Sequence, residues 1–396
     1  MKTTHTTPRQ VHVTETLDVQ TVERELSRLW MENAGRARAE DEVEETAVMR
    51  ARVLNLLVYV SSDAALGEVN ELLSEVTGAH PCRAIVMLAE REREDLDIEM
   101  FVSSYCQAVD VAEERRLCGE QLTLRACGRF AVELPSAAEP LLVPDLPVFL
   151  WWRDRPRLND RVFRKLSHAA DRVVFDSADF LEPHKDLLAL DSLLQKERAA
   201  HTGISDLNWA RLTSWRGLLA SFYDVREYRA ALDNINRVRI EYVAPASVKE
   251  EIAPKALILA GWLASRLGWR VADTQREEKD DEARRKVLME RDGRKIVVEF
   301  QSVERSQTMN GWIARIELSA DAPSARLLFV VARSEDGRYL ETRTTTNDEE
   351  RASRLLVGGD KTEAELLGRE LEILGHDRIY EEAVRSAALI LEALEA

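Results

Sequence analysis

Two nearly uninterrupted apolar runs, LNLLVYV at residues 54–60 and RAIVMLA at residues 83–89, decide the fold that this sequence predicts. Apolar runs of this length, rich in β-branched residues, are typical of strands that are covered on both faces. Between them, residues 63–77 place Leu66, Val69, Leu73 and Val76 at helical spacing. Strand, helix and strand in this order predict a parallel βαβ unit.

The same alternation continues for about a hundred residues. Residues 98–109 predict a third strand, and two short apolar runs at 148–152 and 172–176 flank a helical segment near 161–168. The intervening stretch 135–147 holds four prolines, which exclude one continuous helix or a central strand, so we expect a rigid crossover. These elements predict an α/β N-terminal domain with a mostly parallel sheet and Rossmann-like layers.

Further along, the apolar period changes from helical to alternating. A half-exposed strand is predicted at 237–243, and an antiparallel meander follows it, with hairpin signals at Asp292-Gly293 and Asp336-Gly337. The meander strands are predicted at residues 287–290, 296–300, 312–318, 326–332 and 338–344. Five helices are also predicted. The first spans residues 181–198 and is followed by a loop at 199–205; the second runs from the N-cap Asp206 through Phe222, and the third spans 254–267, before Gly268. The fourth begins at the capping box Thr362-x-x-Glu365, and the fifth carries the apolar stripe Tyr380, Val384, Ala387 and Leu391.

Three segments are therefore expected. Residues 1–47 form a peripheral N-terminal segment that includes a helix at 19–36, residues 48–203 form the α/β domain, and residues 204–396 form an α+β domain. A length of 396 residues agrees with two to three domains. An alternative remains open, in which the strand at 237–243 and the helix after it complete the first sheet.

Charge and composition exclude several classes of protein. With 55 basic and 71 acidic side chains the formal net charge is −16, which argues against nucleic acid or an anionic membrane surface as the main partner. No apolar run reaches the roughly 18 residues of a membrane span, and the first nine residues lack the apolar core of a secretory signal. We expect a cytoplasmic protein.

Motifs for common catalytic and cofactor chemistry are missing. The sequence has no glycine-rich nucleotide fingerprint, no HExxH, no GxSxG and no cysteine pair with zinc spacing, so no catalytic residue, cofactor site or metal site is predicted. His80-Pro81-Cys82 could pair a thiol with a base, but it precedes a strand and is interpreted as a turn. The aspartates Asp171, Asp176 and Asp179 are interpreted as caps and turns at a strand end.

Tryptophan and arginine instead cluster in two places. Trp151, Trp152 and Arg153 end the strand at 148–152, and a second set lies on the helix predicted after Asp206. Its members are Trp209, Arg211, Trp215 and Arg216. These residue types are enriched at protein–protein hot spots, so the seven are candidate partner-binding residues. The competing interpretation is that the tryptophans pack the interior.

Several of these stretches resemble one family. The runs that carry the resemblance are PLLVPDLPVFLWWRD at 140–154, ADRVVFDS at 170–177, SDLNWARLTSWRGLLASFYD at 205–224 and LILAGWLASRLGW at 257–269. Together they are similar to the OpcA family of glucose-6-phosphate dehydrogenase assembly proteins. The matches follow the family's order from about residue 48 to 270, and the later segments agree only in general character.

The resemblance implies a non-catalytic assembly factor and allosteric activator that binds glucose-6-phosphate dehydrogenase, the first enzyme of the oxidative pentose phosphate pathway. In some relatives activation involves cysteines near the C-terminal end, but here no cysteine follows Cys127. The alternatives are a sugar-phosphate-binding enzyme or metabolite sensor of the α/β class, with Arg153 or Arg155 on the phosphate, and a structural subunit without regulatory effect.

Overall fold

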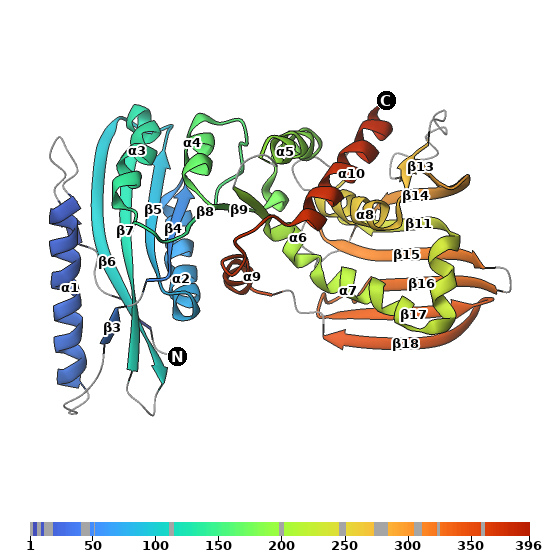
Figure 1. Ribbon diagram of the computed structural model, residues 1–396, viewed down its shortest axis with the longest axis horizontal. Helices are drawn as coiled ribbons and strands as arrows, with labels where there is room; N and C mark the ends of the chain where they lie inside the picture. Colours follow the sequence, from blue (N-terminus) through green and yellow to red (C-terminus); the bar gives the residue numbers. More distant parts are fainter. Residues whose placement is uncertain are drawn as a thin grey trace. The chain divides into compact units, whose positions relative to one another are not determined.

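The computed structural model describes twelve stretches of the chain and divides it into two compact units (Figure 1). The described residues are 3–5, 9–11, 19–40, 48–50, 52–110, 115–197, 202–244, 251–272, 284–304, 311–322, 325–357 and 361–396. Unit 1 comprises Met1–Asp176, Ala200–Ser205 and Thr362–His376, and unit 2 comprises Ser177–Ala199, Asp206–Lys361 and Asp377–Ala396. The domain boundaries drawn from the sequence stay a prediction about independent folding.

Unit 1 is built on the ten-stranded sheet A, in which β7, β5, β4, β8 and β9 run parallel in that spatial order. Strand β6 pairs antiparallel with β7 on one side of this set. The strands are β1 (Thr3–His5), β2 (Arg9–Val11), β3 (Val48–Arg50), β4 (Leu54–Val60), β5 (Cys82–Glu90), β6 (Leu96–Asp110), β7 (Arg115–Cys127), β8 (Val148–Trp152), β9 (Arg172–Phe175) and β10 (Gly203–Asp206). The chain lays down β4, β5 and β7 on one side and then crosses back to place β8 beside β4.

Helices of 3 to 22 residues connect and cover these strands. They are α1 (Val19–Glu40), α2 (Asp63–Ala79), η1 (Gly128–Glu133), α3 (Leu134–Ala138), η2 (Glu139–Leu141), α4 (Arg161–Ala169) and α9 (Glu363–Glu370). Helix α1 lies beside β6 in Figure 1 and buries Val22, Leu26 and Leu29, so the segment predicted to be peripheral contributes a packed helix to unit 1. The proline-rich stretch forms only short helical turns between β7 and β8, which confirms that no continuous helix or strand runs through it.

Unit 2 is built on the eight-stranded sheet B, whose order is β12-β13-β14-β11-β15-β16-β17-β18. Its strands are β11 (Ile235–Tyr242), β12 (Arg270–Val271), β13 (Arg284–Arg291), β14 (Arg294–Ser302), β15 (Ile313–Ala322), β16 (Ala325–Arg333), β17 (Tyr339–Thr346) and β18 (Glu349–Val357). Strands β15 to β18 form the antiparallel meander, while β11 runs parallel to β14. Because β11 belongs to sheet B, the alternative that it completes the first sheet is wrong.

Hairpin turns in sheet B follow from residues that accept positive φ angles. Asp292 and Gly293 have φ of 50° and 77° between β13 and β14, as the Asp-Gly signal predicts. Asn347 and Asp348 have φ of 50° and 68° and join β17 to β18, an edge strand that the sequence pattern did not predict.

Helices of unit 2 pack on sheet B and on one another. They are η3 (Ser177–Asp179), α5 (Pro183–Glu197), α6 (Leu207–Arg211), α7 (Thr213–Ser221), η4 (Phe222–Asp224), η5 (Arg226–Asn234), α8 (Pro254–Leu267) and α10 (Arg378–Glu395). Helices α8 and α10 approach so closely at Gly261 that a Cβ there would lie 2.1 Å from the Ala383 carbonyl oxygen. Gly268 ends α8 with φ 68°, as expected for a left-handed C-terminal residue.

The structure thus combines an α/β unit with a mostly parallel sheet and an α+β unit with an antiparallel meander, which confirms the predicted fold class. Two local predictions are wrong. Residues 203–206 form the short strand β10 instead of a loop. The helix predicted after Asp206 is two helices, because the chain breaks at Leu212, where ψ is −7°. The charged residues 273–283 lie outside the described residues.

Candidate functional site

The carboxyl edge of sheet A carries an open pocket of about 390 Å³. It lies where β4, β5 and β8 end, and β4 stands between the other two strands. We call it the edge pocket. Its lining comprises Tyr59, Ser61, Ala89, Glu90, Arg91, Glu92, Arg93, Trp152, Asp154, Arg155, Arg157 and Asp160. In parallel α/β sheets ligands bind outside the carboxyl ends of strands where the strand order reverses, and β4 and β8 form such a point here.

One wall of the edge pocket is held by a bidentate ion pair. Arg91 Nη1 and Nη2 donate to the two carboxylate oxygens of Asp160 at 2.6 and 3.0 Å. The hydrogen bond from Arg91 lowers the pKa of the Asp160 carboxyl, and the same carboxylate caps α4 by accepting from the amides of Val162 and Phe163. Burial raises the pKa of Tyr59 to about 12, so its phenol keeps its proton at neutral pH.

A second set of charges closes the end of β5. Glu90 accepts from Arg93 Nη1 at 2.8 Å and from Arg125 Nη2 at 3.0 Å. Burial works to raise the pKa of the Glu90 carboxyl, but the two arginines outweigh it and the pKa lies below its ordinary value. Both arginines also lie within 4 Å of Asp63, at the start of α2. The carboxylates of Glu90 and Asp160 are therefore neutralised by partners within unit 1.

The first predicted set lies at the end of β8, and its two tryptophans are buried. Trp151 is 1% exposed in the core, and Trp152 is 3% exposed and stacks on Tyr59 with ring centroids 3.9 Å apart. Arg153 forms ion pairs with Glu68 at 3.2 Å and with Glu363 at 2.8 Å, which join α2 and α9. Of these three residues, only Trp152 lines the edge pocket.

Arg155 and Arg157 were not singled out for partner binding, yet both line the edge pocket with exposed side chains. Neither guanidinium has a hydrogen-bond or ion-pair partner among the residues that the structure describes. The two short charged runs that carry the pocket arginines, RER after β5 and DRPR after β8, directly follow buried strands. That position was the available signal, because carboxyl ends of parallel strands meet at one edge.

The second predicted set lies in unit 2 and is divided between α6 and α7. Trp209 is 4% exposed and Trp215 is 2% exposed, so both are interior residues of the folded chain. Arg216 lies over the Trp209 ring, with its guanidinium carbon 3.3 Å from the centroid, and Arg211 is half-buried. The structure thus brings Trp209 and Arg216 together as a cation–π pair.

Trp209 also belongs to a buried hydrogen-bond network that joins the starts of α6 and α10. Its Nε1 donates to Asp377 Oδ2 at 2.9 Å, and the Tyr380 hydroxyl donates to Asp206 Oδ2 at 3.3 Å. Asp206 also caps α6, as predicted, and accepts from the Ser177 hydroxyl at 2.7 Å. These contacts give Trp209 a structural role within unit 2.

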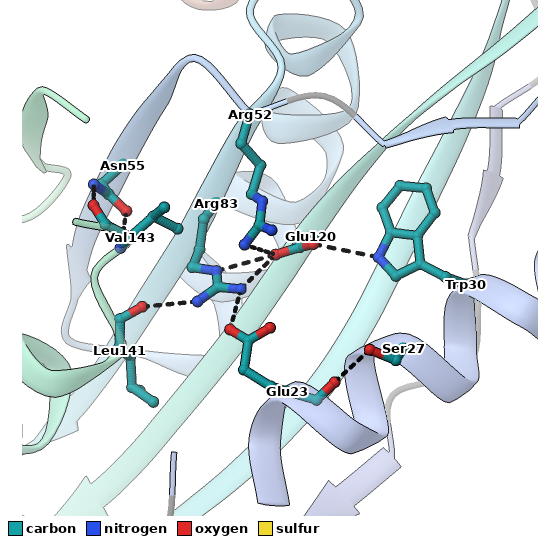
Figure 2. A network of polar contacts seen from close by, with 9 residues as sticks. All are labelled: Glu23, Ser27, Trp30, Arg52, Asn55, Arg83, Glu120, Leu141 and Val143. Atoms are coloured by element: carbon teal, nitrogen blue, oxygen red, sulfur yellow. Dashed lines mark hydrogen bonds and ion pairs between the residues drawn. The ribbon is translucent and has the colours of Figure 1, made fainter. Parts of the chain in front are cut away.

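Figure 2 shows a buried ion cluster in unit 1, built from α1, β5 and β7. Glu120 is inaccessible to solvent and accepts from Arg83 Nε and Nη2 at 3.0 and 2.9 Å and from Trp30 Nε1 at 3.3 Å. Arg83 also donates to Glu23 at 2.6 Å and to the Leu141 carbonyl at 3.1 Å. These hydrogen bonds hold α1 against sheet A, so we assign the cluster a structural role.

The remaining candidates take structural roles. Cys82 is buried on β5, whereas His80 lies beside Glu372 of unit 1 at 3.9 Å, so the two do not form a nucleophile–base pair. Asp171 accepts from the Val148 amide at 2.8 Å, as expected for a cap. Among the described residues, no group of three or more His, Cys, Asp and Glu side chains could hold a metal ion. The described helices include none that is both long and apolar enough to cross a membrane.

Solved structures show only a distant likeness to the chain. A "putative oxidoreductase yvaA" from Bacillus subtilis is 11% identical, with 86% of this chain and 96% of that chain covered and a TM-score of 0.47. A myo-inositol dehydrogenase from Lactobacillus casei, in complex with NAD(H) and myo-inositol, is 9% identical over 87% and 94% of the two chains, with a TM-score of 0.40. Similarity at this level supports no functional conclusion.

Sequence comparisons are more specific. Two family models match, for the N-terminal domain at residues 73–192 and for the C-terminal domain at residues 202–384, and both describe a "Glucose-6-phosphate dehydrogenase subunit". A protein of Nostoc punctiforme named "Putative OxPP cycle protein OpcA" is 31% identical over 328 residues, which are 81% of this chain and 67% of that protein. Proteins of the same name from Synechocystis sp. and Synechococcus elongatus are each 26% identical, over 83% and 81% of this chain and 67% and 70% of theirs. The chain therefore belongs to the OpcA family.

Proposed function

We propose that this protein is a non-catalytic partner of glucose-6-phosphate dehydrogenase in the cytoplasm, where it binds the enzyme, favours its active oligomer and raises its activity in the oxidative pentose phosphate pathway. One observation carries the proposal: models of both the N-terminal and the C-terminal domain of a glucose-6-phosphate dehydrogenase subunit match this chain, in the same order, over residues 73–192 and 202–384.

The turn after β4 supports a role without hydride chemistry. In dinucleotide-binding sheets this turn is rich in glycine, because the backbone must approach a pyrophosphate closely. Here the turn reads Ser61, Ser62 and Asp63, and the Ser62 hydroxyl accepts from the Ala65 amide to cap α2. The Asp63 carboxylate faces Arg93 and Arg125 at the same helix start. Side chains and an acidic group thus occupy the place that a pyrophosphate needs.

Activation has a simple thermodynamic basis. A protein that binds one oligomer of an enzyme more tightly than another shifts the population toward the oligomer that it prefers. If that oligomer also binds substrate better, each ligand strengthens the binding of the other by the same factor. A coupling free energy of about 1–3 kcal/mol changes the affinity roughly 5- to 150-fold.

For the contact itself we propose the two predicted sets as two separate surfaces, one at the end of β8 in unit 1 and one on α6 and α7 in unit 2. The four tryptophans are buried, so they would support the backbone of these surfaces from the interior and would not insert into the partner. They are Trp151, Trp152, Trp209 and Trp215. Arg153, Arg211 and Arg216 are half-buried, so part of each side chain lies at the surface. Arginine above an aromatic ring, as in Arg216 over Trp209, combines the two residue types that are enriched at interface hot spots.

The test uses the full chain and its own dehydrogenase. Light scattering of the mixture measures the oligomer, and initial rates at varied glucose 6-phosphate measure half-saturation. We expect a complex of defined size and a lower half-saturation concentration. Absence of a complex in the presence of substrate would contradict the proposed partner, and NADP reduction by this chain alone would contradict the non-catalytic role.

Substitutions separate the proposed surface from the rest of unit 2. Arg211→Ala and Arg216→Ala should each weaken binding by roughly 2 kcal/mol, whereas Arg226→Ala, at an exposed position of η5, should leave binding unchanged. Trp215→Ala should lower stability instead, by about 3–5 kcal/mol, because the side chain is interior. If both arginine variants activate the enzyme as well as the unchanged chain does, the contact lies elsewhere.

A further inference from the structure

The edge pocket of unit 1 is placed where α/β sheets bind ligands, and of the residues proposed for the contact with the dehydrogenase only Trp152 lines it. Its walls come from three strand ends, β4, β5 and β8, and the chain crosses from one side of β4 to the other between β7 and β8. The volume of about 390 Å³ falls at the lower end of the range for small-molecule sites. The space suits a small metabolite.

Four arginines and four carboxylates line the edge pocket, and the carboxylates are Glu90, Glu92, Asp154 and Asp160. Asp160 is held by Arg91 and by two amides of α4, and Glu90 is held by Arg93 and Arg125. These partners leave both carboxylates ionised and already satisfied, and Asp154 Oδ1 accepts from the Arg155 amide at 2.8 Å. The acidic side chain of the lining without a hydrogen bond among the described residues is the exposed Glu92, whereas two guanidinium groups, those of Arg155 and Arg157, are without a partner there.

The wall that carries the two unpaired arginines is held in place. Trp152 Nε1 donates to the Arg155 carbonyl at 3.4 Å, and the Asp160 amide donates to the Arg157 carbonyl at 2.8 Å. Pro156 between them is buried and fixes the backbone φ angle. The backbone therefore holds two like charges at the rim of one pocket, and an anion between them would relieve their repulsion.

Phosphate is the anion that fits these donors. Arginine binds phosphate through two parallel hydrogen bonds, and such charge-assisted bonds are about twice as strong as neutral ones. A dinucleotide is disfavoured, because the turn after β4 carries the side chains of Ser62 and Asp63 where glycine would let the backbone approach a pyrophosphate. The remaining class is a small phosphate monoester.

We propose that the edge pocket binds a small metabolite with a phosphate monoester group, through the guanidinium groups of Arg155 and Arg157. This proposal distinguishes the two arginines that the sequence offered for a phosphate. Arg153 is taken up by Glu68 and Glu363, whereas Arg155 lines the pocket. The proposal concerns unit 1 by itself and does not require the dehydrogenase.

Calorimetric titration of the full chain with three probes tests it: glucose 6-phosphate, inorganic phosphate and glucose. We expect saturable binding of glucose 6-phosphate, weaker binding of inorganic phosphate at the same site, and no binding of glucose. Higher KCl should weaken both, since the two arginines are exposed. The double variant Arg155→Gln/Arg157→Gln should bind glucose 6-phosphate at least about tenfold more weakly.

The matched control is Arg164→Gln, which removes the same charge from an exposed position of α4 outside the edge pocket. It should bind glucose 6-phosphate as the unchanged chain does. The proposal is overturned if neither phosphate probe binds saturably at millimolar concentration, or if the double variant binds as tightly as the control. Because the dehydrogenase is absent from these titrations, either result leaves the proposed partnership to its own test.

Discussion

Replacing Glu120 by leucine should destabilise unit 1 strongly, because the change leaves a buried arginine without its main counter-charge. Arg83 is 3% exposed and donates two of its hydrogen bonds to Glu120 (Figure 2). After the substitution Arg83 retains only the Leu141 carbonyl and Glu23, and the hydrogen bond from the Trp30 indole N–H to Glu120 is lost. Breaking a buried pair on one side costs about 3–5 kcal/mol.

The double variant Arg83→Leu/Glu120→Leu tests whether the lost stability comes from the unpaired charge of Arg83 or from the poor fit of leucine at position 120. With both charges removed, the main ion pair of the interior is gone as a whole, and replacing a buried pair by apolar side chains is often neutral or stabilising. Two charged groups lose their partner: Glu23, which is 39% exposed, and Arg52, which lies 3.5 Å from Glu120 and is 24% exposed, and both can turn to solvent. The double variant should therefore be more stable than Glu120→Leu alone, which gives a large coupling energy in the cycle.

The free energy of unfolding is measured in urea, with hydrogen exchange of the α1 and β5 amides as the local probe. A local probe is needed because a chain of two units can unfold in more than one step. The control is Glu75→Leu, a change of the same type at an exposed position of α2. A loss below about 1 kcal/mol for Glu120→Leu, or a double variant as unstable as the sum of its single changes, would refute the reasoning.

Three further outcomes follow from single residues. Gly261→Ala should cost about 1–3 kcal/mol in thermal or urea unfolding, because its Cβ would lie 2.1 Å from a backbone oxygen of α10, whereas Gly217→Ala, with no atom within 4 Å, should not destabilise the protein. Burial lowers the pKa of His184, whose Nε2 accepts from the Ile252 amide at 2.8 Å, so the folded state binds fewer protons at this side chain than the unfolded state does. The free energy of unfolding should therefore fall as the pH drops through about 6.5, the ordinary pKa of histidine. The variant His184→Gln should reduce this dependence on pH. Burial raises the pKa of the Cys127 thiol, so mass mapping after brief iodoacetamide treatment of the native protein should find it unmodified.

Interior strands were predictable because burial on both faces leaves a simple pattern. LNLLVYV and VFLWW became β4 and β8 residue for residue, and each run is followed directly by polar residues, Ser61-Ser62 and Arg153-Asp154. Strand β7 was missed because its sequence RRLCGEQLTLRAC mixes charge with apolar residues. Its Glu120 is buried only because Arg83, 37 positions earlier, lies beside it. No local pattern reports such a pairing.

The site was predictable only in part, for a related reason. The adjacent tryptophans at the end of the strand 148–152 were predicted to bind a partner, which stays a prediction, and Trp152 lines the edge pocket. The arginines that give the pocket its character lie in short charged runs, which resemble solvated loops when read alone. Their meaning depends on which strand ends meet, and that is a property of the sheet order.

The sheet order also explains why a chain with Rossmann-like layers can serve recognition instead of hydride transfer. In such a sheet the reversal between β4 and β8 creates a crevice whatever the turn sequence is, because it follows from strand connectivity. The turn residues then decide the ligand. Ser62 and Asp63 carry side chains in the turn where a pyrophosphate site has glycine, while Arg155 and Arg157 place two unpaired guanidinium groups a few residues after β8. A crevice retained without its nucleotide turn is what a binding partner of an enzyme would need in order to sense a small anion, and the titrations of Arg155→Gln/Arg157→Gln decide whether this one does.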